Sequence, residues 1–174
     1  MRRLCCGIAL LVLLLVTAVP AQAQSTPDTS EARDAVLAVV DQLFDGMRAG
    51  DSTAVRAVFD EGAQMQSISQ EEGTSSIRTG SVDRFVEAVG RPHDAVWDER
   101  IWDPVVQIDG PMAMAWTPYA FYLGDTLSHC GVNAIHFIRR GDAWKVFYLV
   151  DTRQQDGCEI PDDVRKGAED EENG

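Results

Sequence analysis

Three turn pairs in the second half of the chain limit its fold most strongly. Asp109-Gly110, Gly124-Asp125 and Gly141-Asp142 separate stretches rich in β-branched and aromatic residues, which is typical of strands joined by tight hairpins. The spacing predicts a four-stranded antiparallel meander with strands near residues 95–108, 111–123, 126–140 and 143–153. Such a sheet has an apolar face that other elements must cover.

The first half of the chain predicts the helices that cover this face. Asp28 and Glu31 resemble a capping box, and apolar residues then recur at helical spacing until Gly50. Asp51 begins a second, shorter helix. The remaining expected elements are two short strands and a third helix, at residues 63–69, 75–79 and 81–90. This order predicts an α+β fold with three N-terminal helices packed on a curved antiparallel sheet.

The two ends of the chain are expected to lie outside this fold. Two Arg residues, a short apolar run and the small residues of Ala21-Gln22-Ala23 predict a signal peptide over residues 1–23, cleaved after Ala23. An uncleaved membrane anchor is the alternative, but the apolar run is shorter than the ~20 residues that a span needs. The mature protein is thus expected to be secreted or periplasmic. It would consist of a linker, one domain and an acidic flexible tail, at residues 24–30, 31–158 and 159–174.

The charge of the chain excludes some classes of partner. Fifteen Lys and Arg residues against 28 Asp and Glu residues give a formal net charge of -13. A protein that binds nucleic acid needs a basic surface to neutralise phosphates, and an anionic membrane makes a similar demand. We therefore expect no nucleic-acid partner, and no membrane partner after signal cleavage.

Two cysteines, Cys130 and Cys158, remain after signal cleavage. Because disulfides persist in oxidising compartments, the sequence predicts a Cys130–Cys158 disulfide. A reactive thiol and two inert buried cysteines are the alternatives. The chain has no C-x-x-C motif and its three His residues are scattered, so no metal and no cofactor are expected.

Several short runs resemble a known superfamily. They are FDGMRAGD at 44–51, WTPYAFY at 116–122, SHCGVN at 128–133, WKV at 144–146 and DTR at 151–153. In these runs the chain resembles bacterial proteins of the nuclear-transport-factor-2-like (NTF2-like) superfamily, with SnoaL-like and lumazine-binding members, over about residues 31–158. The resemblance implies a cone-shaped half-barrel with a pocket at its wide end. It does not select a reaction, because the superfamily includes isomerases, dehydratases, binding proteins and dimerisation modules.

Two-residue hairpin loops would fix which residues face each other across the meander. In that register Glu99 lies opposite Ala120, and Ala120 lies opposite His129. A carboxyl and an imidazole on one concave face are a candidate pair for general acid and base catalysis. The candidate ligand-binding residues on the same face are Tyr122 and Asn133 for polar groups, with Trp97 and Trp116 as apolar walls.

Pro118 makes this assignment of faces sensitive to a bulge. Proline has no N–H for the sheet, so a bulge near Pro118 would reverse part of a strand. Residues of the other face would then enter the pocket, and Tyr119, Asp151 and Arg153 are further candidate ligand-binding residues. A structural reading is also open, in which Asp151 pairs with Arg100 or Arg153 and this face meets solvent or a second copy.

The leading hypothesis from the sequence is an exported protein, expected to be a homodimer, that binds a small apolar or mixed-polarity ligand without catalysis. An isomerase or dehydratase with Glu99 or His129 as the base, and with Tyr122 or Asn133 holding an oxyanion, is the first alternative. A structural dimerisation or protein-interaction module is the second.

Overall fold

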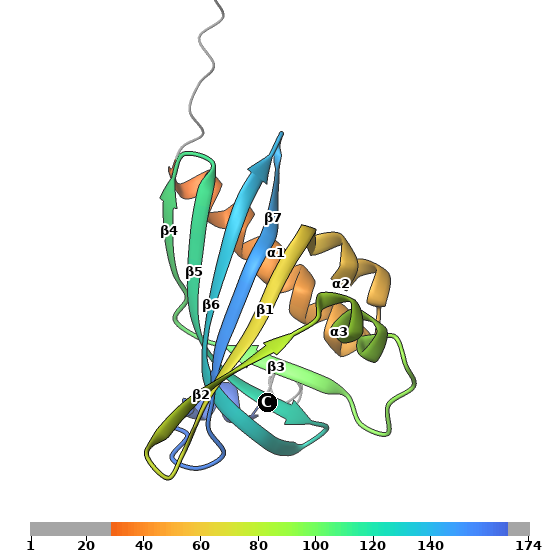
Figure 1. The fold of residues 1–174 in the computed structure, drawn as a ribbon, viewed down its shortest axis with the longest axis vertical. Coiled ribbons are helices and arrows are strands. Elements are labelled where there is room, and N and C mark those ends of the chain that lie inside the picture. Colours follow the sequence, from red (N-terminus) through yellow and green to blue (C-terminus); the bar gives the residue numbers. More distant parts are fainter. Residues whose placement is uncertain (1–28, 167–174) are drawn as a thin grey trace, which may run out of the picture.

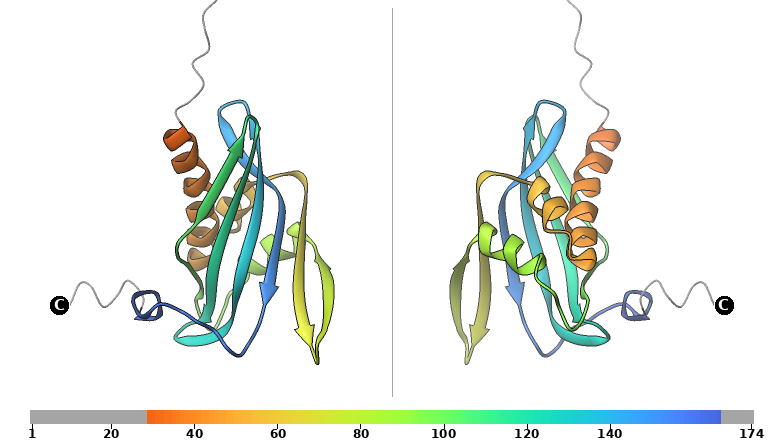
Figure 2. Two further views of the ribbon diagram at one scale, coloured as in Figure 1. Left: turned by 90° about the vertical axis from the view of Figure 1, so that its left-hand side faces the viewer. Right: turned by 90° about the vertical axis from the view of Figure 1, so that its right-hand side faces the viewer.

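The computed structural model describes residues 29–166. The predicted signal peptide, most of the predicted linker and the last part of the predicted tail lie outside these residues. Three helices, α1 (Thr29–Ala49), α2 (Ser52–Val58) and α3 (Val82–Val89), pack on one side of a single sheet (Figure 1, Figure 2). Of the helices within residues 29–166, none combines the length and apolar character needed to cross a membrane.

The sheet has seven strands and is mixed. Its order is β2-β1-β7-β6-β5-β3, and β4 pairs with β5 beside this path. β1 and β7 are parallel, whereas the other pairs are antiparallel. The strands are β1 (Phe59–Glu71), β2 (Thr74–Gly80), β3 (Trp97–Ile101), β4 (Val105–Asp109), β5 (Met112–Leu123), β6 (Thr126–Arg140) and β7 (Ala143–Arg153). The chain therefore has the α+β order expected from its sequence, but the prediction of a wholly antiparallel sheet is wrong, because β1 pairs with β7 in parallel.

Caps and corners define α2 and α3 as the sequence predicts, whereas Asp28, the predicted cap of α1, lies outside the described residues. The Asp51 side chain accepts hydrogen bonds from the first backbone N–H groups of α2, and Ser81 caps α3 in the same way. Gly50, with φ of 66°, provides the left-handed corner between α1 and α2. Gly46 allows close packing there, because a Cβ on it would lie 2.8 Å from Val55 Cγ2.

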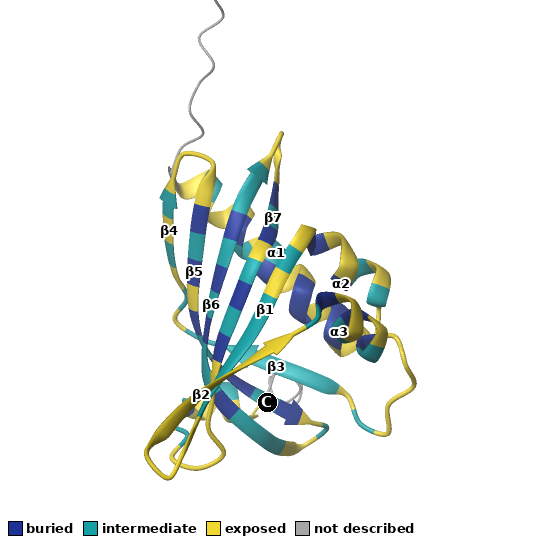
Figure 3. Ribbon diagram, in the orientation of Figure 1, coloured by how far each residue is buried: buried dark blue, intermediate teal, exposed yellow. Residues whose placement is uncertain are grey.

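The core lies between the helices and the inner face of the sheet (Figure 3). On β5, Ala113, Ala115, Thr117 and Tyr119 are buried, whereas the residues between them are more exposed. The prediction that Trp116 lies on the inner face is therefore wrong. Ala113 and Ala115 belong to the same buried core as Leu43 of α1.

The first predicted strand is divided in two. Residues 102–104 interrupt it: Asp103 has a φ of 44° and Pro104 lacks an N–H for the ladder. β4 consequently pairs with the first half of β5 and β3 pairs with the second half. The other three strands of the predicted meander agree with the structure.

The predicted register holds only next to the second and third hairpin turns. At the first turn, Ile108 lies opposite Ala113 instead of Pro111, so β4 is two residues out of the predicted register. Bulges occur between Phe121 and Tyr122 in the β5–β6 pair and between His136 and Phe137 in the β6–β7 pair. No shift occurs at Pro118, within the continuous register of β5 with β6. The predicted row of Glu99, Ala120 and His129 is therefore wrong.

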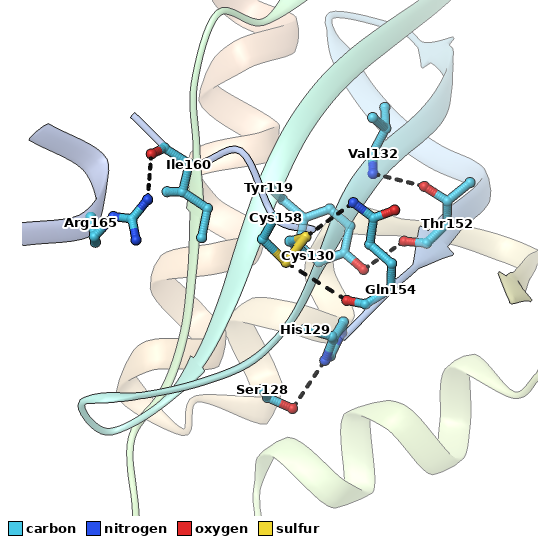
Figure 4. Close-up of a disulfide and its surroundings, with 10 residues drawn as sticks. All are labelled: Tyr119, Ser128, His129, Cys130, Val132, Thr152, Gln154, Cys158, Ile160 and Arg165. Carbon is cyan, nitrogen blue, oxygen red and sulfur yellow. Dashed lines mark hydrogen bonds between the residues drawn. A yellow bond between two sulfur atoms is a disulfide. The ribbon is translucent and has the colours of Figure 1, made fainter. Parts of the chain in front are cut away.

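A disulfide joins Cys130 in β6 to Cys158, as the sequence predicts (Figure 4). The segment of residues 158–166, here called the C-terminal strap, then packs on the side of the sheet away from the cavity. Ile160 is buried with Ala120 and Tyr122. The strap ends in α4 (Asp162–Lys166), so packed structure continues beyond residue 158, where the flexible tail was predicted to begin.

Arg100 holds the end of the strap. Its guanidinium donates to the carbonyl oxygens of Val164 and Arg165, at 3.1 and 3.0 Å, and lies 4.3 Å from the centre of the Tyr122 ring. These carbonyls belong to the last turn of α4 and have no partner within that helix. Arg100 also forms an ion pair with Asp98 at 2.7 Å rather than with Asp151.

Gly131 permits a close crossing of β6 and β7. Tyr119 lies opposite Gly131, and a Cβ at position 131 would lie 1.9 Å from the Thr152 carbonyl oxygen. We expect Gly131→Ala to lower the free energy of unfolding by about 3 kcal/mol or more, because backbone must move. Gly80→Ala is the control, since its Cβ would meet nothing nearer than 3.5 Å. Urea unfolding of both variants measures this, and equal stability would contradict it.

The disulfide is expected to stabilise the fold through the chain that it closes. The two cysteines are 28 residues apart, and the chain-entropy model gives about 3 to 4 kcal/mol for such a loop. The double variant Cys130→Ser with Cys158→Ser should lose that amount in urea unfolding under non-reducing conditions. A loss below about 1 kcal/mol would show that the strap is held by its other contacts alone.

Candidate functional site

A cavity of about 460 Å³ lies between the helices and the inner face of the sheet. This volume is in the range of small-molecule sites. The apolar side chains lining it are Leu43, Phe44, Met47, Met65, Phe85, Trp97, Phe121, Leu123 and Leu149. Its polar side chains are Glu99, Tyr119, Ser128, His129, Asn133, Asp151 and Arg153. The polar side chains all come from strands, namely β3, β5, β6 and β7. Helices α1 and α3 contribute Leu43, Phe44, Met47 and Phe85 to the apolar wall.

Cross-strand pairing brings the polar residues together. Glu99 lies opposite Phe121, which lies opposite His129. Side chains at paired positions share one face of a sheet, so the carboxyl and the imidazole flank the Phe121 ring in the cavity. Asn133 lies opposite Asp151 in the next pair of strands.

Glu99 is held by one hydrogen bond in a desolvated position. Asn133 Nδ2 donates to Glu99 Oε1 at 2.7 Å. Burial raises the pKa of Glu99 to about 7, with the negative charge of Asp151 adding to this and the Asn133 hydrogen bond opposing it. At neutral pH the Glu99 carboxyl thus exchanges between its acid and its carboxylate form, as proton-transfer residues do.

Asp151 is a buried carboxylate surrounded by donors. Ser67 on β1 donates to Oδ1 at 2.7 Å, and Arg153 Nε donates to Oδ2 at 2.5 Å. The Tyr119 hydroxyl also lies 3.2 Å from Oδ2. Asp151 therefore pairs with Arg153, one of the two partners that the sequence left open. These contacts link three strands at the polar end of the cavity.

Tyr119 is a hydrogen-bond donor in this arrangement. Its hydroxyl donates to the Thr152 carbonyl oxygen at 2.9 Å (Figure 4). This contact is shorter than the one with Asp151. Burial raises the pKa of Tyr119, and the negative charge of Asp151 acts in the same direction. The phenol therefore stays neutral at physiological pH.

His129 contacts aromatic rings and one hydroxyl. Its Nδ1 lies 3.1 Å from Ser128 Oγ, and its ring centre lies 5.1 Å from that of Phe121 and 5.7 Å from that of Tyr119. Burial lowers the pKa of His129, and the Arg153 charge lowers it further. The imidazole is accordingly neutral at pH 7.

The cavity contains seven of the nine candidate catalytic and ligand-binding residues. They are Trp97, Glu99, Tyr119, His129, Asn133, Asp151 and Arg153. The other two do not line it. Trp116 is 46% exposed on the outer face, and Tyr122 lies beneath Arg100 against the strap. Tyr122 therefore cannot hold an oxyanion in this cavity.

Several contributors were not predicted as site residues. Leu43, Phe44 and Met47 follow the helical spacing of α1, which marks them as buried but not as cavity lining. Ser67 was not predicted because its contact with Asp151 depends on the parallel pairing of β1 with β7. This pairing joins distant segments and has no local sequence pattern. Within residues 29–166, no three His, Cys, Asp or Glu side chains gather as metal ligands.

The pKa of Glu99 predicts a specific pH dependence of stability. The folded protein keeps a proton that the unfolded chain, with a pKa of 4.5, releases, so the free energy of unfolding should fall as pH rises from about 4.5 to 7. In Glu99→Gln this contribution disappears. The difference in free energy of unfolding, variant minus wild type, should therefore increase between pH 4.5 and 7, by about 3 kcal/mol at most.

Urea unfolding of both proteins at several pH values measures this difference, with the exposed Glu71→Gln as the control variant. A constant difference between wild type and Glu99→Gln from pH 4.5 to 8 would contradict a raised pKa.

The fold is similar to several solved structures. An NTF2-like protein of unknown function from Shewanella baltica has 13% identity and a TM-score of 0.60, covering 75% of this chain and 99% of that chain. The beta subunit of a putative aromatic-ring-hydroxylating dioxygenase from Novosphingobium aromaticivorans also has 13% identity and a TM-score of 0.60, covering 78% and 95%. At such identities the likeness shows the fold alone.

A third similar structure is a putative scytalone dehydratase from Novosphingobium aromaticivorans, with 10% identity, a TM-score of 0.56 and coverage of 72% and 86%. A comparison with curated proteins finds no match. One family model matches residues 31–147, which is most of the described fold. The chain therefore belongs to the NTF2-like family described as "Putative lumazine-binding".

Proposed function

We propose that this protein binds a small molecule, with an apolar body and a few polar groups, in the cavity at the wide end of a cone-shaped fold. The observation that carries the proposal is the separation of chemistry within the cavity. Leu43, Phe44 and Met47 form an apolar wall from α1, whereas Glu99 and Asn133 belong to the polar end. A ligand of mixed polarity would match both.

The family description agrees with a ligand of this kind. Lumazine is a planar bicyclic compound with carbonyl and N–H groups, and the cavity offers donors and acceptors beside aromatic rings. We further propose that the chain is exported by its predicted signal peptide and acts outside the cytoplasm, where the Cys130–Cys158 disulfide would be maintained.

Binding without chemistry accounts for the contacts better than an acid and base pair does. The candidate partners Glu99 and His129 do not contact each other: Glu99 receives its hydrogen bond from Asn133, and His129 approaches Ser128. Each has its own protein partner, and neither is held in place by the other.

An isomerase or dehydratase is the second candidate function. The pKa of Glu99 near 7 favours it, because a carboxyl poised at neutral pH can take a proton beside a carbonyl. Since Tyr122 lies outside the cavity, Tyr119 and Asn133 would have to stabilise the oxyanion.

We also propose a homodimer through the outer face of the sheet. Val105, Met112, Trp116 and Phe147 are exposed apolar side chains on β4, β5 and β7. Two copies of a strongly acidic chain repel each other over most of their surface, whereas these exposed apolar side chains could meet those of a second copy in a two-fold contact.

Binding of the neutral apolar fluorophore N-phenyl-1-naphthylamine tests the proposed function. The mature protein should enhance its fluorescence with one site per chain, because the apolar wall excludes water. Ser128→Phe puts bulk into the cavity and should weaken binding at least about tenfold, since overlap of a few atoms removes most of the apolar contact. Thr126→Phe, on the same strand but exposed, is the matched control.

Absence of saturable binding, or equal binding by both variants, would contradict a ligand site in this cavity. Native mass spectrometry of the same samples reports co-purified ligand and the number of chains in the assembly.

A further inference from the structure

The polar end of the cavity carries a positive charge whose hydrogen-bonding capacity is largely unused. Arg153 donates from Nε to Asp151 Oδ2 at 2.5 Å. Its two terminal nitrogens, Nη1 and Nη2, have no acceptor within residues 29–166. The side chain is 49% exposed and lines the cavity, so these N–H groups are available to a bound molecule.

The carboxylate beside Arg153 is already committed to the protein. Both oxygens of Asp151 accept hydrogen bonds, Oδ1 from Ser67 and Oδ2 from Arg153, with the Tyr119 hydroxyl within reach of Oδ2. Asp151 fixes the Nε side of the guanidinium and leaves the opposite edge open. A planar guanidinium edge with two N–H groups matches the two oxygens of a carboxylate.

Glu99 is the second group that faces a ligand at this end. Its Oε1 accepts from Asn133, whereas Oε2 has no partner in the described part of the chain. Because the pKa of Glu99 is about 7, a large share of the molecules at neutral pH carry a proton there and can donate it in a hydrogen bond. The remaining titratable neighbours, His129 and Tyr119, are neutral.

We propose that Arg153 is the ligand-recognition residue of the cavity and that the ligand class is a small monocarboxylate with an apolar, ring-containing body. The carboxylate forms two parallel hydrogen bonds with the open guanidinium edge, protonated Glu99 donates a further one, and the ring lies against Phe121 and the α1 wall. This inference deepens the proposed binding function and rests on it. A cationic ligand would instead be repelled by the positive charge of Arg153.

A matched series of naphthalene compounds tests the proposal by isothermal titration calorimetry at pH 6.5. The probes are 2-naphthoate, the neutral 2-naphthamide and the cationic 2-naphthylmethylamine. The wild-type protein should bind the carboxylate at least about tenfold more tightly than the amide, and the amine most weakly, because hydrogen bonds to charged groups are the stronger ones.

Variants assign the preference to Arg153. Arg153→Gln should weaken 2-naphthoate binding about tenfold to a hundredfold and leave 2-naphthamide within about twofold. Arg91→Gln removes the same charge from a surface pair with Glu87, outside the cavity, and should change neither. Arg153→Lys keeps the charge without the planar edge and should give intermediate binding of the carboxylate.

The outcomes separate the two levels of the proposal. Equal affinity of the wild-type protein for carboxylate and amide, with N-phenyl-1-naphthylamine still bound, would overturn the ligand class and leave the binding function standing. Unchanged 2-naphthoate affinity in both Arg153 variants would overturn the role of Arg153. Failure of every naphthalene compound and of N-phenyl-1-naphthylamine to bind would overturn the binding function itself.

Discussion

The buried Asp151 carboxylate is the interaction on which the rest of the site depends. A charge in a desolvated position must be hydrogen-bonded, and here Ser67, Tyr119 and Arg153 provide the donors from β1, β5 and β7. Tyr119 lies opposite Gly131 and reaches past β6 to β7, where a side chain at position 131 would collide with Thr152. Satisfying one carboxylate thus fixes the spacing of the strands and turns the Arg153 side chain toward the cavity. The polar end of the cavity is a consequence of this requirement.

The sequence predicts the elements well because their signals are local. Caps and glycine corners mark the helices, and the turn pairs mark the hairpins, so α1 to α3 and most strands lie where expected. The register is not local. Relative to the predicted register, β3 and β6 are each shifted by one residue along β5. The two shifts are equal, so Glu99 and His129 still lie opposite the same residue of β5. That residue is Phe121, whereas the predicted register places Ala120 there.

The same shift explains which candidate residues were placed correctly. Bulges exchange Tyr122 for Tyr119 and bring Asp151 and Arg153 to the cavity face. The sequence allowed for an exchange of faces caused by a bulge at Pro118, but Pro118 pairs in continuous register, and Glu99 and His129 stay on the cavity face. A bulge is a tertiary compromise between strand twist and packing, and it leaves no residue pattern that a single sequence reveals.

We propose that a small molecule binds in the cavity between α1 and the sheet. Backbone amide NMR of the protein titrated with N-phenyl-1-naphthylamine tests this directly, because each resonance reports one position. We predict shifts confined to cavity residues such as Phe121, His129 and Leu149. Shifts confined instead to the outer face, around Trp116 and Phe147, would contradict the claim.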